Sequence, residues 1–116
     1  MLAGNSVLMA EPLIETVIGT AEYLCELTGE KLGGKIGFRT GKDRCDSRET
    51  QILICTTELA LVREICGHNR RFNTLIIDEF HEGRLDQETL EAFAWKGMLE
   101  GTSAFSEVDI LSATMD

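Results

Sequence analysis

The stretch Thr74-Leu75-Ile76-Ile77-Asp78-Glu79-Phe80-His81-Glu82 joins an apolar run directly to a group of ionisable side chains. Residues 74–77 are strand-favouring or apolar, which is typical of a strand that is buried on both faces. In an open α/β sheet, ligands bind at the carboxyl ends of the strands. We therefore expect Asp78 and Glu79 to lie at a functional edge of a sheet. The alternative is that they only begin a solvated loop.

The two carboxylates suit different tasks in phosphoryl transfer. Asp78 can hold a hydrated Mg²⁺, because this ion keeps several waters and takes only one or two protein carboxylates. Glu79 can orient and deprotonate a water for attack on a phosphoryl group. A different hypothesis adds His81 and Glu82 to make a metal-dependent hydrolase. The H-E-x-x-H motif of zinc hydrolases would then require a histidine at position 85, where the chain has leucine.

The rest of the chain alternates short apolar runs with segments of helical spacing. We expect strands at about 6–9, 36–38, 51–55, 74–77 and 109–111, and helices at about 12–28, 58–65 and 86–99. Such alternation predicts an α/β fold with a parallel sheet, right-handed crossovers and helices on both faces. Residues 40–49 show no periodicity and are predicted to be a loop.

Several residues are predicted to begin or end these helices. Pro12 suits the first turn of the first helix, where its missing N–H is tolerated. Thr56 or Thr57 can cap the second helix and Gly67 can end it. Asp86 is a plausible cap for the third.

Length and composition predict one small domain over residues 1–116. Hydrophobic residues make up 43% of the chain, and no run of 18 apolar residues or secretory signal is present, so we expect a soluble intracellular protein, cytoplasmic or nuclear, with no membrane contact. The four cysteines include no C-x-x-C pair, which disfavours a zinc ribbon or a redox dithiol. Cys66 and His68 are two residues apart, but we interpret Cys66 as an ordinary buried thiol.

The charge is negative overall but unevenly distributed. The formal net charge is −9, which argues against a general basic surface for nucleic acid. Residues 31–48 contain six basic and two acidic side chains, whereas residues 78–116 contain ten acidic and two basic ones. The basic segment could contact phosphates locally, although a solvated loop is the more common meaning of such a run.

Five pieces of sequence resemble the DExH-box ATP-dependent helicases, and most of all the DEAH-type RNA helicases. Asp78-Glu79-Phe80-His81 and Ser112-Ala113-Thr114 resemble motifs II and III of that family. Glu11-Pro12 is similar to the Gln-Pro that opens motif Ia, and Thr57-Glu58 resembles motif Ib. Gly37-Phe38-Arg39 resembles the Gly-Tyr-x-Arg segment between them. The pieces occur in the family's order and span nearly the whole chain.

The resemblance implies a role for each matched residue. Asp78 would bind Mg²⁺ through water, Glu79 would be the catalytic base, and both would lie in the nucleotide site. His81 would link that site to motif III, whose residues Ser112, Ala113 and Thr114 would couple hydrolysis to strand separation. Contacts to the backbone of single-stranded RNA or DNA would come from Glu11, Pro12, Arg39 and Thr57.

Departures from the family pattern are as informative as the matches. The two arginines that usually follow the proline of motif Ia are Leu13 and Ile14 here, and the glycine usual in motif Ib is Leu59. No G-x-x-x-x-G-K-[ST] phosphate loop occurs in the chain. Thr40-Gly41-Lys42 looks like a remnant of a phosphate loop, but it follows motif Ia instead of preceding it. We therefore interpret its similarity to a phosphate loop as misleading.

The chain therefore resembles part of a first RecA-like domain, from motif Ia to motif III, without the phosphate-loop strand. Full-length members of the family use ATP and Mg²⁺, but we expect neither to bind tightly here, because phosphoryl transfer depends on positioning. This chain alone is expected to be inactive unless the missing helicase segments or a partner chain supply the rest. The alternative is a non-catalytic α/β interaction module derived from a truncated or split helicase.

The missing strand also has a consequence for the sheet. In the family, the strand that carries the phosphate loop lies beside the strand that ends in Ser-Ala-Thr. We therefore expect Asp109-Ile110-Leu111 to be an edge strand with unpaired backbone groups. Such an edge recruits other chains, so self-association is predicted.

Overall fold

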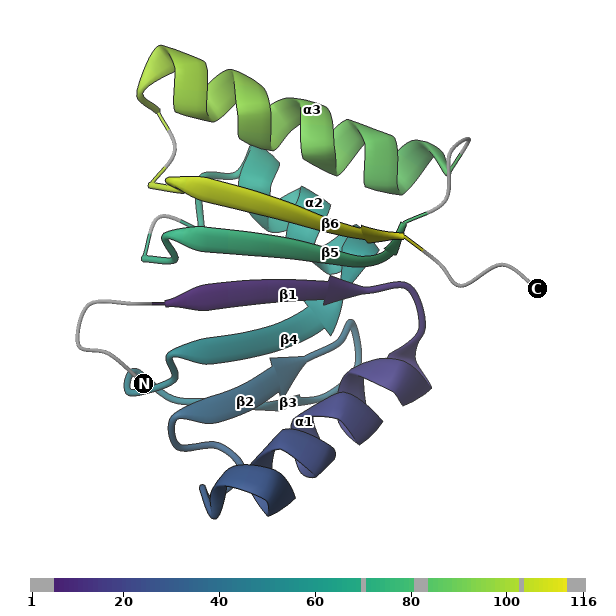
Figure 1. The fold of residues 1–116 in the computed structure, drawn as a ribbon, viewed down its shortest axis with the longest axis vertical. Helices are drawn as coiled ribbons and strands as arrows, with labels where there is room; N and C mark the ends of the chain where they lie inside the picture. Colours follow the sequence, from purple (N-terminus) through teal and green to yellow (C-terminus); the bar gives the residue numbers. More distant parts are fainter. Residues whose placement is uncertain (1–5, 70, 81–83, 103, 113–116) are drawn as a thin grey trace.

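The computed structural model describes residues 6–69, 71–80, 84–102 and 104–112. Six strands and three helices follow one another along the chain (Figure 1). Their bounds are β1 Val7–Glu11, α1 Ile14–Thr28, β2 Ile36–Arg39, β3 Arg44–Cys45, β4 Ile52–Thr56, α2 Thr57–Ile65, β5 Thr74–Phe80, α3 Leu85–Glu100 and β6 Glu107–Ser112. Every helix and strand expected from the sequence is therefore present, with β3 as an addition.

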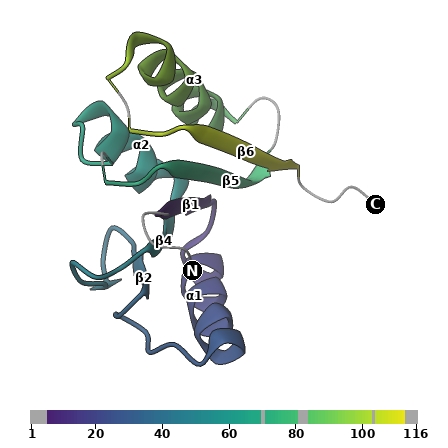
Figure 2. The same ribbon diagram turned by 60° about the vertical axis from the view of Figure 1, so that its left-hand side comes forward.

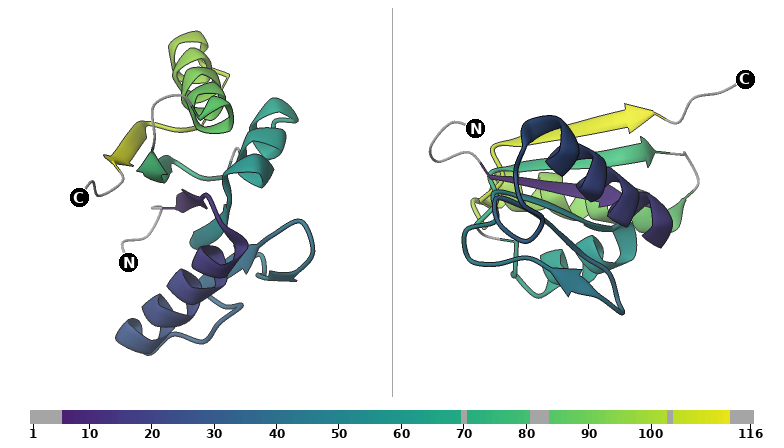
Figure 3. Two further views of the ribbon diagram at one scale, coloured as in Figure 1. Left: turned by 90° about the vertical axis from the view of Figure 1, so that its right-hand side faces the viewer. Right: turned by 90° about the horizontal axis from the view of Figure 1, so that it is seen from below.

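The strands form one sheet in the order β3-β2-β4-β1-β5-β6. All neighbours are parallel except β2 and β3, which are antiparallel. Helix α1 lies on one face of the sheet, and α2 and α3 lie on the other (Figures 2 and 3). The predicted α/β class, the parallel core of the sheet and the helices on both faces are confirmed.

Each face of the sheet has its own hydrophobic core. Alternate strand residues face opposite sides, so β1 sends Leu8 and Ala10 to one core and Met9 to the other. The core under α2 and α3 includes Leu53, Leu75, Ile77, Leu90 and Phe72, all nearly or completely buried. The core under α1 is smaller and consists of Val17, Ala21, Ile36, Phe38 and Ile54.

The expected loop at 40–49 contains the short strand β3, so that prediction was wrong in part. Arg39 pairs with Arg44 and Phe38 with Cys45, which folds the segment back onto β2 as a hairpin. Gly37 makes this possible, because a Cβ there would lie 2.6 Å from the carbonyl oxygen of Cys45. Two-residue strands show little hydrophobic alternation, so the sequence pattern could not reveal this one.

The ends of the helices differ in detail from the sequence expectation. Leu13 is the N-cap of α1, so Pro12 precedes the helix instead of lying in its first turn. Thr56 caps α2 through a hydrogen bond from the Leu59 N–H, as predicted. Asp86 lies inside the first turn of α3 and not at its cap, which is Arg84. Its carboxylate pairs with the Arg84 guanidinium at 3.0 Å.

β6 lies at one edge of the sheet, as predicted. Within the described residues it pairs with β5 alone. Its exposed or half-buried residues include the acidic Glu107 and Asp109 and the apolar Ile110 and Leu111. None of the helices in the described ranges is both long and apolar enough to cross a membrane.

Candidate functional site

The carboxyl ends of β1 and β5 bring Glu11 and Asp78 next to each other. The two strands are parallel neighbours, and Ala10 pairs with Ile77, so the following residue of each strand comes next in register. Ala10 and Ile77 face the core under α2 and α3, which turns Glu11 and Asp78 toward the α1 side. The pairing of β1 with β5 therefore places Glu11, from the Glu11-Pro12 pair, beside Asp78, from the Asp78-Glu79 pair.

The backbone at Glu79 has an unusual conformation. Its φ angle is 51°, in the left-handed region that non-glycine residues rarely adopt, and the pairing of β5 with β6 shifts register between Ile77 and Phe80. The Asp78 carboxylate accepts a hydrogen bond of 2.9 Å from the Glu79 N–H. Backbone strain of this kind costs about 1–3 kcal/mol and concentrates at functional sites. An irregularity in strand pairing also changes the direction of the side chains within it, which here are those of Asp78 and Glu79.

Gln87 of α3 holds this irregular segment in place. Its side chain is completely buried, and its amide nitrogen lies 3.2 Å from the carbonyl oxygen of Glu79 and 3.5 Å from that of Asp78. The residue therefore fixes the backbone on which both carboxylates sit. Gln87 was not predicted from the sequence, where the available signal was a single amide side chain three residues before the apolar Leu90.

Glu11 is a buried acid at the same site. Its side chain is 1% exposed, Oε1 has no hydrogen-bond partner within the described part of the chain, and Oε2 accepts a 3.4 Å hydrogen bond from the Thr20 hydroxyl. Burial, followed by the nearby Asp78 carboxylate and the charge of Glu79, raises the pKa of Glu11 to about 8. Glu11 is therefore mainly protonated at neutral pH, so it adds little negative charge beside Asp78.

These carboxylates suit a hard cation that keeps most of its water. No group of three or more metal-ligating side chains converges within the described ranges, which excludes an all-protein cage there. A half-buried Asp78 and an exposed Glu79 provide the one or two carboxylates that Mg²⁺ takes beside phosphate oxygens. The donor set thus fits Mg²⁺ and not a structural zinc.

Several predicted site residues lie at the margin of the described structure. The backbone of Ser112 pairs with Phe80, which brings the end of β6 beside the Asp78-Glu79 segment. His81, Glu82, Ala113 and Thr114 fall outside the described residues.

A groove of about 640 Å³ lies between α1, α2 and the β2–β3 turn, next to the segments expected to contact nucleic acid. The groove is lined by Pro12, Leu13, Ile14, Glu15, Gly41, Lys42, Thr56, Glu58, Leu59 and Val62. Leu13 and Val62 are each 56% exposed, and Lys42 is the only basic side chain among the lining residues. Glu11 and Thr57 are 1% exposed and Arg39 lines a different hollow, so of the four predicted contacts only Pro12 lines this groove. We call it the motif Ia/Ib groove.

The segment Thr40-Gly41-Lys42 forms the turn of the β2–β3 hairpin. The Thr40 hydroxyl accepts hydrogen bonds from the N–H groups of Lys42 and Asp43, at 3.2 and 3.0 Å. A phosphate loop instead joins a strand to the N-terminus of a helix. The position of this segment in a hairpin turn agrees with the interpretation that its similarity to a phosphate loop is misleading.

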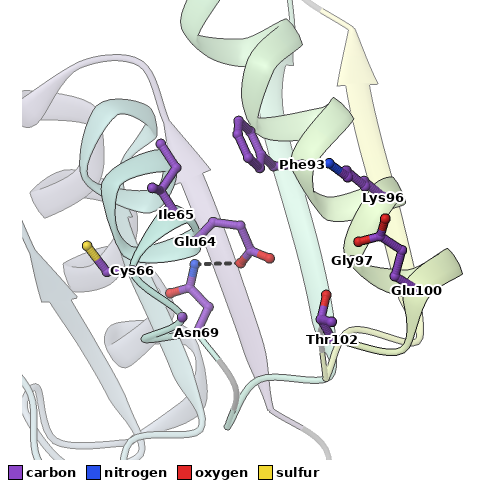
Figure 4. A pocket seen from close by; sticks show the side chains of 10 residues that line it. Glu64, Ile65, Cys66, Asn69, Phe93, Lys96, Gly97, Glu100 and Thr102 are labelled. Carbon is purple, nitrogen blue, oxygen red and sulfur yellow. Dashed lines mark hydrogen bonds between the residues drawn. The ribbon is translucent and has the colours of Figure 1, made fainter.

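A separate pocket of about 340 Å³ lies between the C-terminal halves of α2 and α3 (Figure 4). Glu64 accepts a 3.0 Å hydrogen bond from Asn69 there, and Lys96 and Glu100 project from α3 (Figure 4). None of the predicted site residues lines this pocket. Cys66, which does, is exposed, so its interpretation as a buried thiol was wrong; the residue follows the last turn of α2 and leaves the core.

Comparisons with known proteins point to one family. No family model matches the chain. It is 30% identical over 113 residues to the human probable ATP-dependent RNA helicase DHX40, covering 93% of this chain and 14% of that protein. It is 28% identical over 112 residues to the Aedes aegypti probable ATP-dependent RNA helicase spindle-E, covering 96% of this chain and 8% of that protein.

The fold is similar to that of a solved helicase. The crystal structure of the Escherichia coli DEAH/RHA helicase HrpB superposes with a TM-score of 0.81 at 24% identity, covering 97% of this chain and 14% of that chain. The match confirms the partial RecA-like fold. This chain thus spans a small fraction of the length of each of these proteins.

Proposed function

We propose, on the premise that this chain is a relative of the DExH/DEAH-box ATP-dependent RNA helicases, that it contributes the Mg²⁺ and water-activating carboxylates of a helicase ATP-binding domain. The observation that carries the proposal is the strained Asp78-Glu79 segment at the carboxyl end of β5. It combines the family's acidic pair with a backbone that Gln87 holds in a rare conformation.

Each acidic residue has a distinct task. Asp78 would hold Mg²⁺ through water, and the ion when bound would neutralise charge on the phosphate oxygens. Glu79, exposed near the carboxyl end of β5, would orient a water and accept its proton. Glu11 would remain protonated beside Asp78 and would limit the charge repulsion within the site.

ATP·Mg²⁺ should bind this chain only weakly. The 116 residues contain no phosphate loop, so the backbone amides and lysine that would hold the phosphates are not among them. We expect a dissociation constant in the millimolar range or above, equivalent to about −4 kcal/mol. Calorimetry that shows micromolar binding would contradict this expectation.

The function itself is tested by locating that weak site. A titration with Mg²⁺ and ATP, followed by amide NMR shifts, should perturb Asp78, Glu79 and Gln87 before other residues. Asp78→Asn should remove these shifts, whereas Asp109→Asn on β6 should leave them unchanged. Shifts confined to another part of the molecule, or unchanged in Asp78→Asn, would refute the proposed role.

The family relationship also suggests weak contact with single-stranded RNA or DNA. Pro12 lines the motif Ia/Ib groove, Thr57 begins the helix beside it, and Arg39 lies at the base of the adjoining hairpin. Because the groove itself is mainly apolar and has one lysine, binding there should be weak and independent of sequence, and the surplus of positive charge in residues 31–48 should make the binding fall steeply with salt.

A further inference from the structure

Two neighbouring hollows lie between α2 and the β2–β3 hairpin and continue toward the start of the sheet. Their volumes are about 350 and 560 Å³, and Arg48 and Arg71 line both. Together they include the basic side chains Lys35, Arg39, Arg44, Arg48, Arg63 and Arg71. We call these two hollows the arginine groove. More than half of the eleven lysines and arginines of the chain therefore gather in one place.

Two of the guanidinium groups are held in position by the protein. Arg71 donates hydrogen bonds to the carbonyl oxygens of Ser47, Arg48 and Thr50, at 3.5, 3.2 and 3.0 Å. Arg63 donates to the Asn69 side chain at 3.0 Å and to the His68 carbonyl at 2.8 Å. None of these acceptors carries a negative charge, so the hydrogen bonds orient the two cations without neutralising them. A site arranged in this way loses less side-chain entropy when an anion binds.

The acids of the groove are too few to balance its cations. Asp46 is the acid of the first hollow and Glu49 that of the second, which leaves a surplus of four positive charges. Asp46 accepts 3.0 Å hydrogen bonds from the Nε atoms of Arg39 and Arg44. Within the described residues, the terminal nitrogens of both arginines make no other hydrogen bond.

The cations also repel one another. Burial lowers the pKa of Arg63, and the neighbouring charges of Arg39 and Arg71 lower it further. An anion that entered the groove would relieve this repulsion, because it interacts favourably with every cation that lines the walls.

We propose that the arginine groove binds the phosphate backbone of a single nucleic-acid strand. The proposal rests on the proposed function in taking nucleic acid as the ligand, but it places the main contact on the hairpin side of α2, away from the motif Ia/Ib groove. Two joined hollows with cations along both fit a chain of phosphates better than one small anion. Among the described residues, the side chains that line both hollows are mainly cationic or polar and include no aromatic ring, so they would contact phosphates and not base edges, and binding should be independent of sequence.

Uneven charge makes such binding compatible with an acidic protein. The segment 78–116 carries ten acids against two basic residues, whereas all six cations of the groove come from residues 35–71. Exposed charges further apart than about 10 Å are largely screened at 0.1 M salt. The local surplus therefore decides what the groove attracts.

The test measures anisotropy of a labelled oligouridylate strand with the full chain at low and at moderate salt. The double variant Arg44→Gln/Arg48→Gln removes two exposed cations of the groove, and thermal melting checks that it remains folded. Lys31→Gln is the matched control, because it removes an exposed cation that lines neither hollow nor the motif Ia/Ib groove, and Lys42→Gln tests the motif Ia/Ib groove separately. We expect the double variant to bind about 10-fold more weakly and to reduce the salt slope by about 1.4, at about 0.7 per phosphate contact on a single strand. Lys31→Gln should change affinity less than about two-fold.

Other results would overturn the proposal in distinguishable ways. A loss of affinity in Lys42→Gln but not in the double variant would refute the arginine groove and retain the RNA contact at motifs Ia and Ib. No measurable binding by the wild-type chain at low salt would refute both sites, while the nucleotide titration would still stand. Equal affinity for polyglutamate would show a general anion site and would refute the assignment to nucleic acid.

Discussion

The two edges of the sheet differ in length, charge and protection. The β3 edge is a two-residue antiparallel strand whose hairpin carries Arg39 and Arg44 around a buried Asp46. The β6 edge is a six-residue parallel strand with Glu107 and Asp109 on one face. The Asp109 carboxylate raises the pKa of Glu107, by hydrogen bonding and by charge. Short strands protect a sheet edge and long apolar ones recruit partners, so the β3 edge suits a polyanion and the β6 edge suits another strand.

The largest expected effect comes from breaking the β3 edge at Gly37. Gly37→Ala would place a Cβ 2.6 Å from the Cys45 oxygen and 2.8 Å from the Asp46 Cβ, so the hairpin must move. We expect a loss of about 3 kcal/mol in the free energy of unfolding, measured by urea denaturation, together with weaker nucleic-acid binding.

Gly19→Ala is the control for that change. No atom outside the helix's own backbone lies within 4 Å of a Cβ at position 19 in α1, and alanine is the better helix former by about 0.5–1 kcal/mol. A similar loss of stability in both variants would show that the crowding at Gly37 is not the cause.

The next largest effect concerns Glu11, in the middle of the sheet between the two edges. Its pKa is raised from 4.5 to about 8, so the buried acid costs no stability below pH 4.5 and costs progressively more as the pH rises through 8. Glu11→Gln, which restores the family's residue, should match the wild type at pH 4 and become more stable than it as the pH rises from 4.5 to 8, by several kcal/mol at pH 9, since the shift spans about 3.5 pKa units at about 1.4 kcal/mol each.

Thermal or urea unfolding across this pH range measures the difference. Glu15→Gln, at an exposed position on α1, controls for the removal of one negative charge. A constant difference between Glu11→Gln and the wild type at all pH values would refute the raised pKa.

A smaller effect is expected at the β6 edge. Ile110→Lys should reduce self-association, because a lysine on an edge strand disfavours pairing with a second chain. Helix content should change less than the association does. Sedimentation of the wild type and the variant at high micromolar concentration measures the effect.

Leu111→Lys tests whether the face of the edge matters, since Leu111 is 45% exposed and neighbouring residues of a strand face opposite sides. A wild-type chain that is already monomeric and melts cooperatively would contradict self-association through β6.

The smallest effect on stability is expected in the motif Ia/Ib groove. Leu13 and Ile14 are exposed, so Leu13→Arg/Ile14→Arg should change the free energy of unfolding by less than about 0.5 kcal/mol. The double variant restores the family's two arginines and should tighten binding of single-stranded RNA with a steeper salt dependence. Anisotropy titrations that show no gain would indicate that this groove does not contact the strand.

Local sequence determined most of the elements of this protein. The apolar run at 74–77, the helical spacing after Pro12 and the cap at Thr56 depend on periodicity and on neighbours a few residues away. The resemblance to the family's motifs likewise pointed to Asp78 and Glu79 as candidate site residues, because short motifs need only local order. Both the periodicity patterns and the motifs can be recognised from residues that lie close together in the sequence.

Only the tertiary structure decided how distant residues meet. The proximity of Glu11 to Asp78 depends on the register of β1 against β5, and the position of Gln87 under Glu79 depends on how α3 packs. The arginine groove joins a hairpin, a helix and the loop before β5, so a count of charge along the chain found only the part between 31 and 48. Charge, burial and pKa are set by neighbours in space, and parallel strands bring together neighbours that are far apart in sequence.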